Sequence, residues 1–233
     1  MADKHTQELL FFLDTAEDFL RDGQRRTRHR DTAPEMPSMD SYSVENDSVE
    51  AIAEEVRLCS ACGLHSMRHT AVPGEGVQKP HVLVIGEAPG ADEDSSGRPF
   101  VGRAGQLLDK MLEAIDCSRD KNCFITNMIK CRPPENRDPQ PAEVHACKHF
   151  LVRLIALIEP KVILCVGRIA AQALLNTTVG IGELRGKWTA YYGIPFFPIY
   201  HPSALLRNPN LKRPTWEDLK LFRTTLDQLI SQE

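Results

Sequence analysis

The 233-residue sequence has no long apolar run, few aromatic residues and no recognisable export signal. Its longest purely apolar stretches, such as VILCV, have about five residues, whereas a membrane-spanning helix needs roughly 18. The first 20 residues carry acidic side chains within and after their apolar patch and lack a small-residue cleavage site. The 14 Gly and 16 Pro are ordinary numbers, which excludes collagen-like and wholly disordered chains. We therefore expect a globular cytoplasmic protein with no membrane partner.

Acidic residues outnumber basic ones over the whole chain, but not over the residues that follow position 54. The chain has 28 Lys/Arg and 32 Asp/Glu, and a net charge of −4 by itself argues against a nucleic-acid partner. Residues 1–54 hold 6 of the basic and 13 of the acidic residues, which leaves 22 and 19 for the rest. An acidic segment thus precedes a slightly basic body, so the net charge gives no argument against DNA binding.

The seven cysteines are an odd number in a chain without an export signal, which indicates a reducing compartment where thiols bind metals or stay free. Cys59 and Cys62 form a C-x-x-C motif, and Cys131 and Cys147 are a second pair. A redox C-x-x-C would follow a strand, whereas this one follows a predicted helix. Four thiolates suit structural zinc and an iron–sulfur cluster alike, and the spacing leaves both open. The other three are predicted to be small buried hydrophobes: Cys117, Cys123 and Cys165.

Residues 1–48 are predicted to form an extension outside the folded domain. Apolar residues at helical spacing over 8–20 predict one amphipathic helix. The Ser/Asp/Pro-rich stretch 31–48 has too little apolar surface to order itself. Binding of a replication or repair protein, packing on the domain and a solubility role are all open for this extension.

Residues 49–233 are predicted to form one domain, because apolar runs and amphipathic segments alternate along them. Strands are predicted over residues 82–85, 123–126, 162–166 and 195–199, with a further edge strand or hairpin at 187–193. Helices are predicted over residues 49–56, 107–115, 141–158, 170–175 and 215–230. This order indicates an α/β fold, a three-layer sandwich in which helices flank a central, mainly parallel four-stranded sheet.

Ligands in such folds bind at the carboxyl ends of the strands, so the loops 86–102, 127–137 and 201–207 should converge. The first of them begins Gly86-Glu-Ala-Pro-Gly90. It lacks the Gly-Lys-Ser/Thr of a P-loop and the spacing of a dinucleotide-binding motif, and acids at 92–94 would repel a pyrophosphate. A nucleotide hydrolase or dehydrogenase is therefore disfavoured.

Three residues of these loops are candidates for contacting a planar ligand. Phe100 lies on a loop shaped by Gly and Pro, where it serves either as a stacking platform or as a hydrophobic plug. Asn127, at a strand exit, has the donor and acceptor needed to read the edge of a base, although Asn is also a common turn residue. His201 is fixed by the proline that follows it and is a candidate functional histidine.

Together, several stretches of the sequence resemble the family 4 uracil-DNA glycosylases, the iron–sulfur branch of the uracil-DNA glycosylase superfamily. They are VLVIGEAPGADEDSSGRPFVGRAGQLLDKML, CFITNMIKCRPPENRDPQPAEVHAC, LRGKW and YHPSALLRNP, together with the C-x-x-C motif. The resemblance covers about residues 49–230 and does not extend to the segment before them. It implies release of uracil from single- or double-stranded DNA by a monomer, which leaves an abasic site.

The resemblance also implies roles for individual residues. The backbone of Gly86 and Glu87 would complete a uracil pocket in which Phe100 stacks on the flipped base. The Asn127 side chain would bind the uracil edge, and His201 would stabilise negative charge on uracil O2. A [4Fe–4S] cluster would be bound by four thiolates: Cys59, Cys62, Cys131 and Cys147.

Further residues match positions that support catalysis or touch DNA in this family. Glu87, Glu93 and Asn136 are the candidates for positioning the attacking water, and the resemblance does not choose among them. The expected DNA contacts are Gly90, Ser203, Leu206 and Arg207.

Three other functions compete with this one. A broader-specificity family 5 enzyme is one, and a non-catalytic uracil-DNA-binding or scaffold homologue is another. A related branch crosslinks to DNA through a histidine in an inserted loop. The corresponding stretch here, residues 130–138, has neither insertion nor histidine, which favours turnover.

Overall fold

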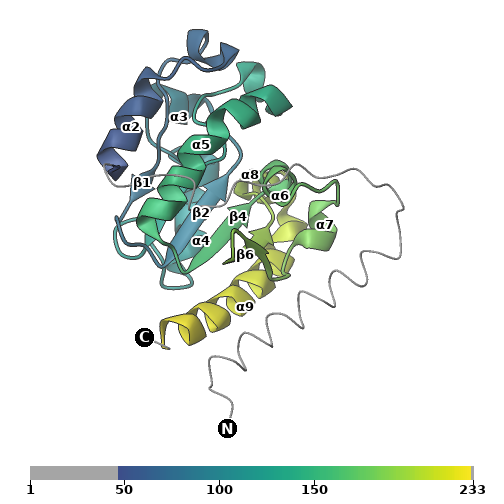
Figure 1. Cartoon of the computed structure of the whole chain (residues 1–233). Helices are drawn as coiled ribbons and strands as arrows, with labels where there is room; N and C mark the ends of the chain where they lie inside the picture. Colours follow the sequence, from purple (N-terminus) through teal and green to yellow (C-terminus); the bar gives the residue numbers. More distant parts are fainter. Residues whose placement is uncertain (1–46, 232–233) are drawn as a thin grey trace, which may run out of the picture. The chain divides into compact units, whose positions relative to one another are not determined.

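The structure is a computed structural model that describes residues 47–231 (Figure 1). It contains a six-stranded sheet in the order β1-β3-β2-β4-β6-β5. Its four central strands are mutually parallel. They are the four predicted apolar runs: β2 (Val82–Gly86), β3 (Cys123–Asn127), β4 (Val162–Val166) and β6 (Ile194–Ile199). Because β3 and β4 lie on opposite sides of β2, the strand order reverses at β2, where α/β folds bind ligands.

The predicted number of four strands is wrong, because an antiparallel strand is added at each edge. β5 (Thr189–Tyr191) pairs with β6 and lies within the predicted edge strand. β1 (Glu75–Gly76) pairs with β3 and was not predicted, because two residues without an apolar side chain carry no strand pattern. Gly76 has φ +151°, and a Cβ there would overlap the Cys123 carbonyl, so this pairing requires glycine.

The five helices predicted within residues 49–233 are confirmed: α2 (Val49–Leu58), α4 (Arg103–Glu113), α5 (Pro141–Ile158), α6 (Arg168–Leu175) and α9 (Lys212–Ile230). The Ser48 side chain caps α2 by accepting a hydrogen bond from Ala51 N–H at 3.0 Å. Three short helices were not predicted, because four to six residues are too few to show a helical period: α3 (Ala91–Ser96), α7 (Ile181–Leu184) and α8 (Pro202–Arg207). Three 3₁₀ turns complete the described chain: η3 (Gly63–Ser66), η4 (Pro134–Asn136) and η5 (Pro209–Leu211).

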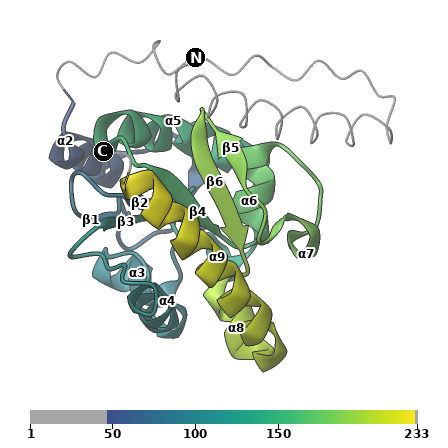
Figure 2. The same ribbon diagram turned by 90° about the horizontal axis from the view of Figure 1, so that it is seen from below.

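The helices form two layers, one on each face of the sheet, so the predicted three-layer sandwich is confirmed. Alternate residues of β2 point to opposite faces: Val82 and Val84 to one, Leu83 and Ile85 to the other. The first face packs against α4 and α9, and the second against α5 and α6 (Figure 2). Cys117, Cys123 and Cys165 are fully buried in these layers, as predicted.

A third, smaller core lies where α2 packs on α5. It contains Ile52 and Val56 of α2, Phe150 of α5 and Ile129 of the loop after β3. Arg153 of α5 strengthens this packing by binding two carboxylates, those of Asp47 and Glu55. The helix that precedes the C-x-x-C motif is thereby fixed against α5.

The predicted extension lies almost entirely outside the described residues, and so does the helix predicted over 8–20. The domain boundary after residue 48 stays a prediction. Within residues 47–231, no helix is both long enough and apolar enough to cross a membrane.

We predict that Gly105→Ala destabilises the fold, because a Cβ on this residue of α4 would overlap the carbonyl group of Phe100. Overpacking of this kind costs about 1–3 kcal/mol. For a chain of this size, 2 kcal/mol lowers the melting temperature by roughly 4–8 °C, which calorimetry would detect. Gly182→Ala in α7 is the matched control, since a Cβ there meets one atom at 3.8 Å. Equal melting temperatures for the two variants would contradict the prediction.

Candidate active site

A cavity of about 580 Å³ opens at the carboxyl ends of the four parallel strands. The three loops predicted to converge all line it. Each strand places one residue at the cavity: Glu87 follows β2, Asn127 ends β3, Gly167 follows β4 and His201 follows β6 with one residue between. Parallel pairing alone brings these four residues together, since the carboxyl ends of all four strands lie at one edge.

Most of the predicted site residues line this cavity: Glu87, Gly90, Glu93, Phe100, Asn127, Asn136, His201, Ser203 and Arg207. Gly86 lies beneath it, where a Cβ would stand 2.5 Å from both the Asn127 Oδ1 and the Phe100 ring. Leu206 does not line the cavity but is 46% exposed beside Arg207, at the end of α8.

Phe100 forms one wall of the cavity and is only 6% exposed. Its φ of +53° is unusual for a residue with a side chain, and the surrounding loop enforces it. The Arg119 guanidinium donates to the carbonyls of Pro99 and Phe100, and Asp109 holds that guanidinium. The Phe100 ring lies 5.9 Å from the His201 ring with 30° between their planes, so the wall continues into His201.

Asn127 is 1% exposed, and its Oδ1 is a buried acceptor for which the described residues provide no donor. Leaving a buried polar atom unpaired costs about 1–3 kcal/mol. The atom belongs to a residue that lines the cavity, so a ligand N–H can satisfy it.

His201 is held as a neutral ring with its proton on Nε2. The Ser203 N–H donates to Nδ1 at 3.1 Å, and the Ser203 hydroxyl lies 2.9 Å from the same atom. Burial, with a smaller effect of the Arg207 charge, lowers the pKa of His201 to about 4. Gly167, with φ +107°, permits this close packing, since a Cβ there would lie 3.1 Å from the imidazole. At neutral pH the ring therefore offers a hydrogen-bond donor without a positive charge.

Glu87 is the cavity carboxyl group best suited to proton transfer. Burial, and to a lesser degree the Asp138 charge, raises the pKa of Glu87 to about 7, against the opposing effect of Arg168. None of the described residues donates a hydrogen bond to its carboxylate. A carboxyl group with a pKa near the working pH is well matched to general-base chemistry.

The other two candidates for water positioning are already engaged by the protein. The Glu93 carboxylate accepts hydrogen bonds from the backbone N–H groups of Gly90, Val101 and Gly102, at 2.9–3.0 Å. The Asn136 Oδ1 accepts from Arg132 Nε at 2.8 Å. Glu93 thus shapes the loop that carries Phe100.

Charged side chains at the mouth of the cavity are mostly paired. Arg137 binds the Glu143 carboxylate at 2.6 and 2.9 Å, and Arg168 binds Asp138 at 3.1 Å. Among the described arginines that line the cavity, Arg207 alone has no ion pair. It is the cation at the mouth best able to meet a phosphate.

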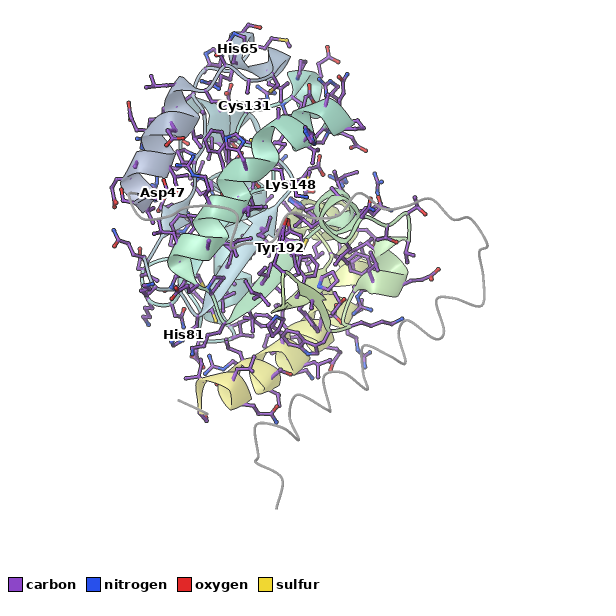
Figure 3. All side chains as sticks on the ribbon, viewed as in Figure 1. Asp47, His65, His81, Cys131, Lys148 and Tyr192 are labelled. Carbon is purple, nitrogen blue, oxygen red and sulfur yellow. The ribbon has the colours of Figure 1, made fainter. Side chains whose placement is uncertain are left out.

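The four predicted metal ligands, Cys59, Cys62, Cys131 and Cys147, line a second cavity and form no disulfide. Figure 3 shows Cys131 below the turn that carries His65. Arg68 Nη1 donates to Cys131 Sγ at 3.0 Å, and Ala61 N–H donates to Cys59 Sγ at 3.5 Å. Over the described part of the chain, no three His, Cys, Asp or Glu side chains are grouped to hold a single metal ion.

Some residues of the two cavities were not predicted. Gly167 could have been found, because it directly follows a buried apolar run, much as Gly86 ends one. Asp138 and Arg168 act on Glu87 through space and leave no pattern in the sequence. Lys130, buried beside the cysteines, would be read as a surface residue from its type alone.

Comparison with known proteins gives one consistent family. The profile of the "Uracil DNA glycosylase superfamily" matches residues 73–220. The chain is 44% identical to the type-4 uracil-DNA glycosylase of Saccharolobus solfataricus, over 77% of this chain and 87% of that protein. It is 42% identical to the type-4 uracil-DNA glycosylase of Thermotoga maritima, over 74% of this chain and 91% of that protein. A type-5 uracil-DNA glycosylase of Pyrobaculum aerophilum is 32% identical, over 64% and 71%.

The type-4 proteins thus match at higher identity, and over more of both chains, than this type-5 protein. The chain belongs to the uracil-DNA glycosylase superfamily and, within it, to the type-4 uracil-DNA glycosylases.

Proposed function

We propose that this chain is a DNA-repair enzyme that turns a uracil nucleotide out of DNA, hydrolyses its N-glycosidic bond and leaves an abasic site. The unpaired, buried Asn127 Oδ1 beside the Phe100 wall is the observation that carries this proposal. A base inside the double helix cannot reach such a pocket, so the nucleotide must rotate out of the stack.

Base recognition follows from the hydrogen-bonding groups of Asn127. Uracil presents an N3–H donor to the free Oδ1 and an O4 acceptor to the amide NH₂. Cytosine presents a bare nitrogen and an amino group instead, which would face like groups. The Phe100 ring supplies a flat apolar surface on which the base stacks.

Bond cleavage leaves negative charge on uracil O2 and positive character on the sugar. The Nε2–H of neutral His201 can donate to O2 as that charge develops. Glu87, once ionised, can accept a proton from the attacking water or stabilise the sugar cation. We assign the water to Glu87 rather than to Glu93 or Asn136, because the latter two already accept hydrogen bonds from the protein.

DNA binding rests in this proposal on a few groups near the cavity: Gly90, Ser203, Leu206 and Arg207. The exposed Leu206 would fill the space left by the flipped nucleotide, and Arg207 would contact a phosphate. We propose that the enzyme works as a monomer in the cytoplasm and that residues 1–48 are available to a replication or repair protein.

We further propose that the four cysteines hold a [4Fe–4S] cluster, and the residues of the second cavity fit it. The thiols come from three segments, namely the turn after α2, the loop after β3 and helix α5, and they are free of disulfides and line one cavity. Arg68 and Ala61 donate hydrogen bonds to two of the sulfurs, as expected around cluster thiolates. When bound, the cluster would crosslink the C-x-x-C turn to the loop after Asn127, and the hydrolysis itself needs no redox step.

We predict that Asn127→Asp lowers uracil release about 10–100-fold, because an ionised carboxylate cannot donate to uracil O4. Release of free uracil from single-stranded and paired oligonucleotides measures this, with cytosine, thymine and hypoxanthine substrates alongside. Asn176→Asp, an exposed residue at the end of α6, adds the same charge away from the cavity and should keep full activity. Failure of the parent chain to release uracil would overturn the proposed function.

We predict that kcat/KM rises with pH and is half-maximal near pH 7, because the pKa of Glu87 is raised to about 7 and its ionised form is the active one. Glu87→Gln should remove this acid limb and lower the plateau. A pH–rate profile of both proteins on a uracil-containing oligonucleotide measures it.

His201→Ala is the comparison variant for the same profile. It should lower kcat about 10²–10³-fold, the usual cost of one preorganised donor, and leave the midpoint near pH 7 in place. The roles of Glu87 and His201 would be reversed if the pH–rate profile showed an acid limb near pH 6.5 that is lost in His201→Ala and kept in Glu87→Gln.

We predict that the purified chain contains iron and acid-labile sulfide, with a broad visible absorbance, and that Cys131→Ser loses them. Iron analysis and spectroscopy measure this. Cys117→Ala should keep its iron, because Cys117 lies in the sheet core and not at the second cavity. A colourless parent with zinc in place of iron would refute the cluster.

A further inference from the structure

Lys130 is a buried cation that lies between the two cavities. It is 2% exposed and is among the largest fully buried side chains of the described chain. It lines the cysteine cavity. Its Nζ donates to Thr126 Oγ1 at 2.5 Å and to the Asn127 carbonyl at 2.8 Å. One side chain therefore touches both the cysteine cavity and the backbone of the residue proposed to read uracil.

Among the described residues, the ammonium group of Lys130 has no carboxylate to balance its charge, and one of its three N–H donors has no acceptor. It has three N–H donors, and the two oxygens use two of them. No carboxylate of the described residues forms an ion pair with it. A charge buried without a partner costs several kcal/mol, so this position requires a negative group nearby. The sulfurs of Cys131 and Cys147 line the same cavity as Lys130, and as thiolates they would supply that negative charge.

The oxygens that hold the ammonium are themselves fixed. The Thr126 hydroxyl donates to the Pro73 carbonyl at 2.8 Å. Just beyond Asn127, the N–H of Met128 donates to the Gly86 carbonyl at 2.8 Å, so the end of β3 stays attached to β2. Lys130 completes this set by holding the Asn127 carbonyl, and a rotated Asn127 peptide would carry the amide side chain away from the base.

We infer that Lys130 is a positioning residue, whose ammonium group is balanced by the anionic cysteine centre and in turn holds Asn127 in the orientation that reads uracil. Base recognition then depends on the cysteine centre through one side chain. This inference rests on the proposed cluster and on the proposed role of Asn127. Lys130 does not itself touch the base.

Arg68 provides the matched comparison. It also brings a positive charge to the cysteine cavity, through the 3.0 Å hydrogen bond from Nη1 to Cys131 Sγ. Its other anchor is the Arg57 carbonyl, at 2.6 Å, and it has no hydrogen bond to Asn127. Loss of either cation changes the charge at the cysteines, but only loss of Lys130 releases Asn127.

The test compares Lys130→Met and Arg68→Met as iron-loaded proteins. Both should show a negative shift in the cluster's reduction potential, measured by voltammetry of the DNA-bound protein, because each removes a positive charge. Lys130→Met should lower kcat/KM for uracil release about tenfold or more, chiefly through KM, while Arg68→Met lowers it by less than about threefold. Lys130→Met with full iron and parental kcat/KM, or equal losses in both variants, would overturn the inference.

If Lys130→Met does not fold or does not load iron, Thr126→Val tests the role of Lys130 instead. It keeps the lysine charge and removes one of its two anchors, so iron content should stay normal while kcat/KM falls about threefold or more. Unchanged kcat/KM in Thr126→Val would overturn the inference. A parent chain that binds no iron would instead refute the proposed cluster, so the two failures are distinguishable.

Discussion

The parallel pairing of β2 with β3 sets Gly86 opposite Asn127, and the whole candidate active site depends on this register. A side chain at residue 86 would fill the space now occupied by the Asn127 amide and the Phe100 ring. Because strand side chains alternate between faces, a slip by one residue would turn Asn127 away from the cavity. Gly167 leaves room for the His201 ring in the same way, since a Cβ there would lie 3.1 Å from it. Glycine at residues 86 and 167 thus provides the room for the side chains to which the proposed function assigns base recognition and leaving-group stabilisation.

Burial also sets the electrostatics of the cavity, because it favours the uncharged form of both His201 and Glu87. It lowers the pKa of His201 and raises the pKa of Glu87, so both groups shift toward their neutral forms. A flipped base is itself neutral, and it enters a site that presents dipoles more than fixed charges. Apart from the ionised Glu87 that the proposed mechanism requires, charge then appears as the glycosidic bond breaks, when a preorganised donor has its largest effect.

The sequence predicted those parts of the fold and site whose residues carry a local pattern. Apolar runs located the four parallel strands. Because ligands bind at the carboxyl ends of such strands, Glu87, Asn127 and His201 were predicted to meet at one site. β1 carries no pattern, since its pairing depends on the close approach of Gly76 to a neighbouring backbone. The loop-holding hydrogen bonds of Glu93 are equally invisible, because three backbone N–H groups from a folded loop make them.

The stretch between Asn127 and η4 explains why a hydrolase without a redox step would keep a metal cluster. β3 ends at Asn127 and η4 begins at Pro134, so the residues between them have no regular secondary structure to fix them. In the proposed assignment, Cys131 is tied to the cluster and Lys130 to the carbonyl of Asn127. Both anchors lie within four residues of the amide that reads the base. In that assignment, a covalent crosslink at this point would restrict the loop where the helices and strands cannot, and would order the Asn127 amide before DNA arrives.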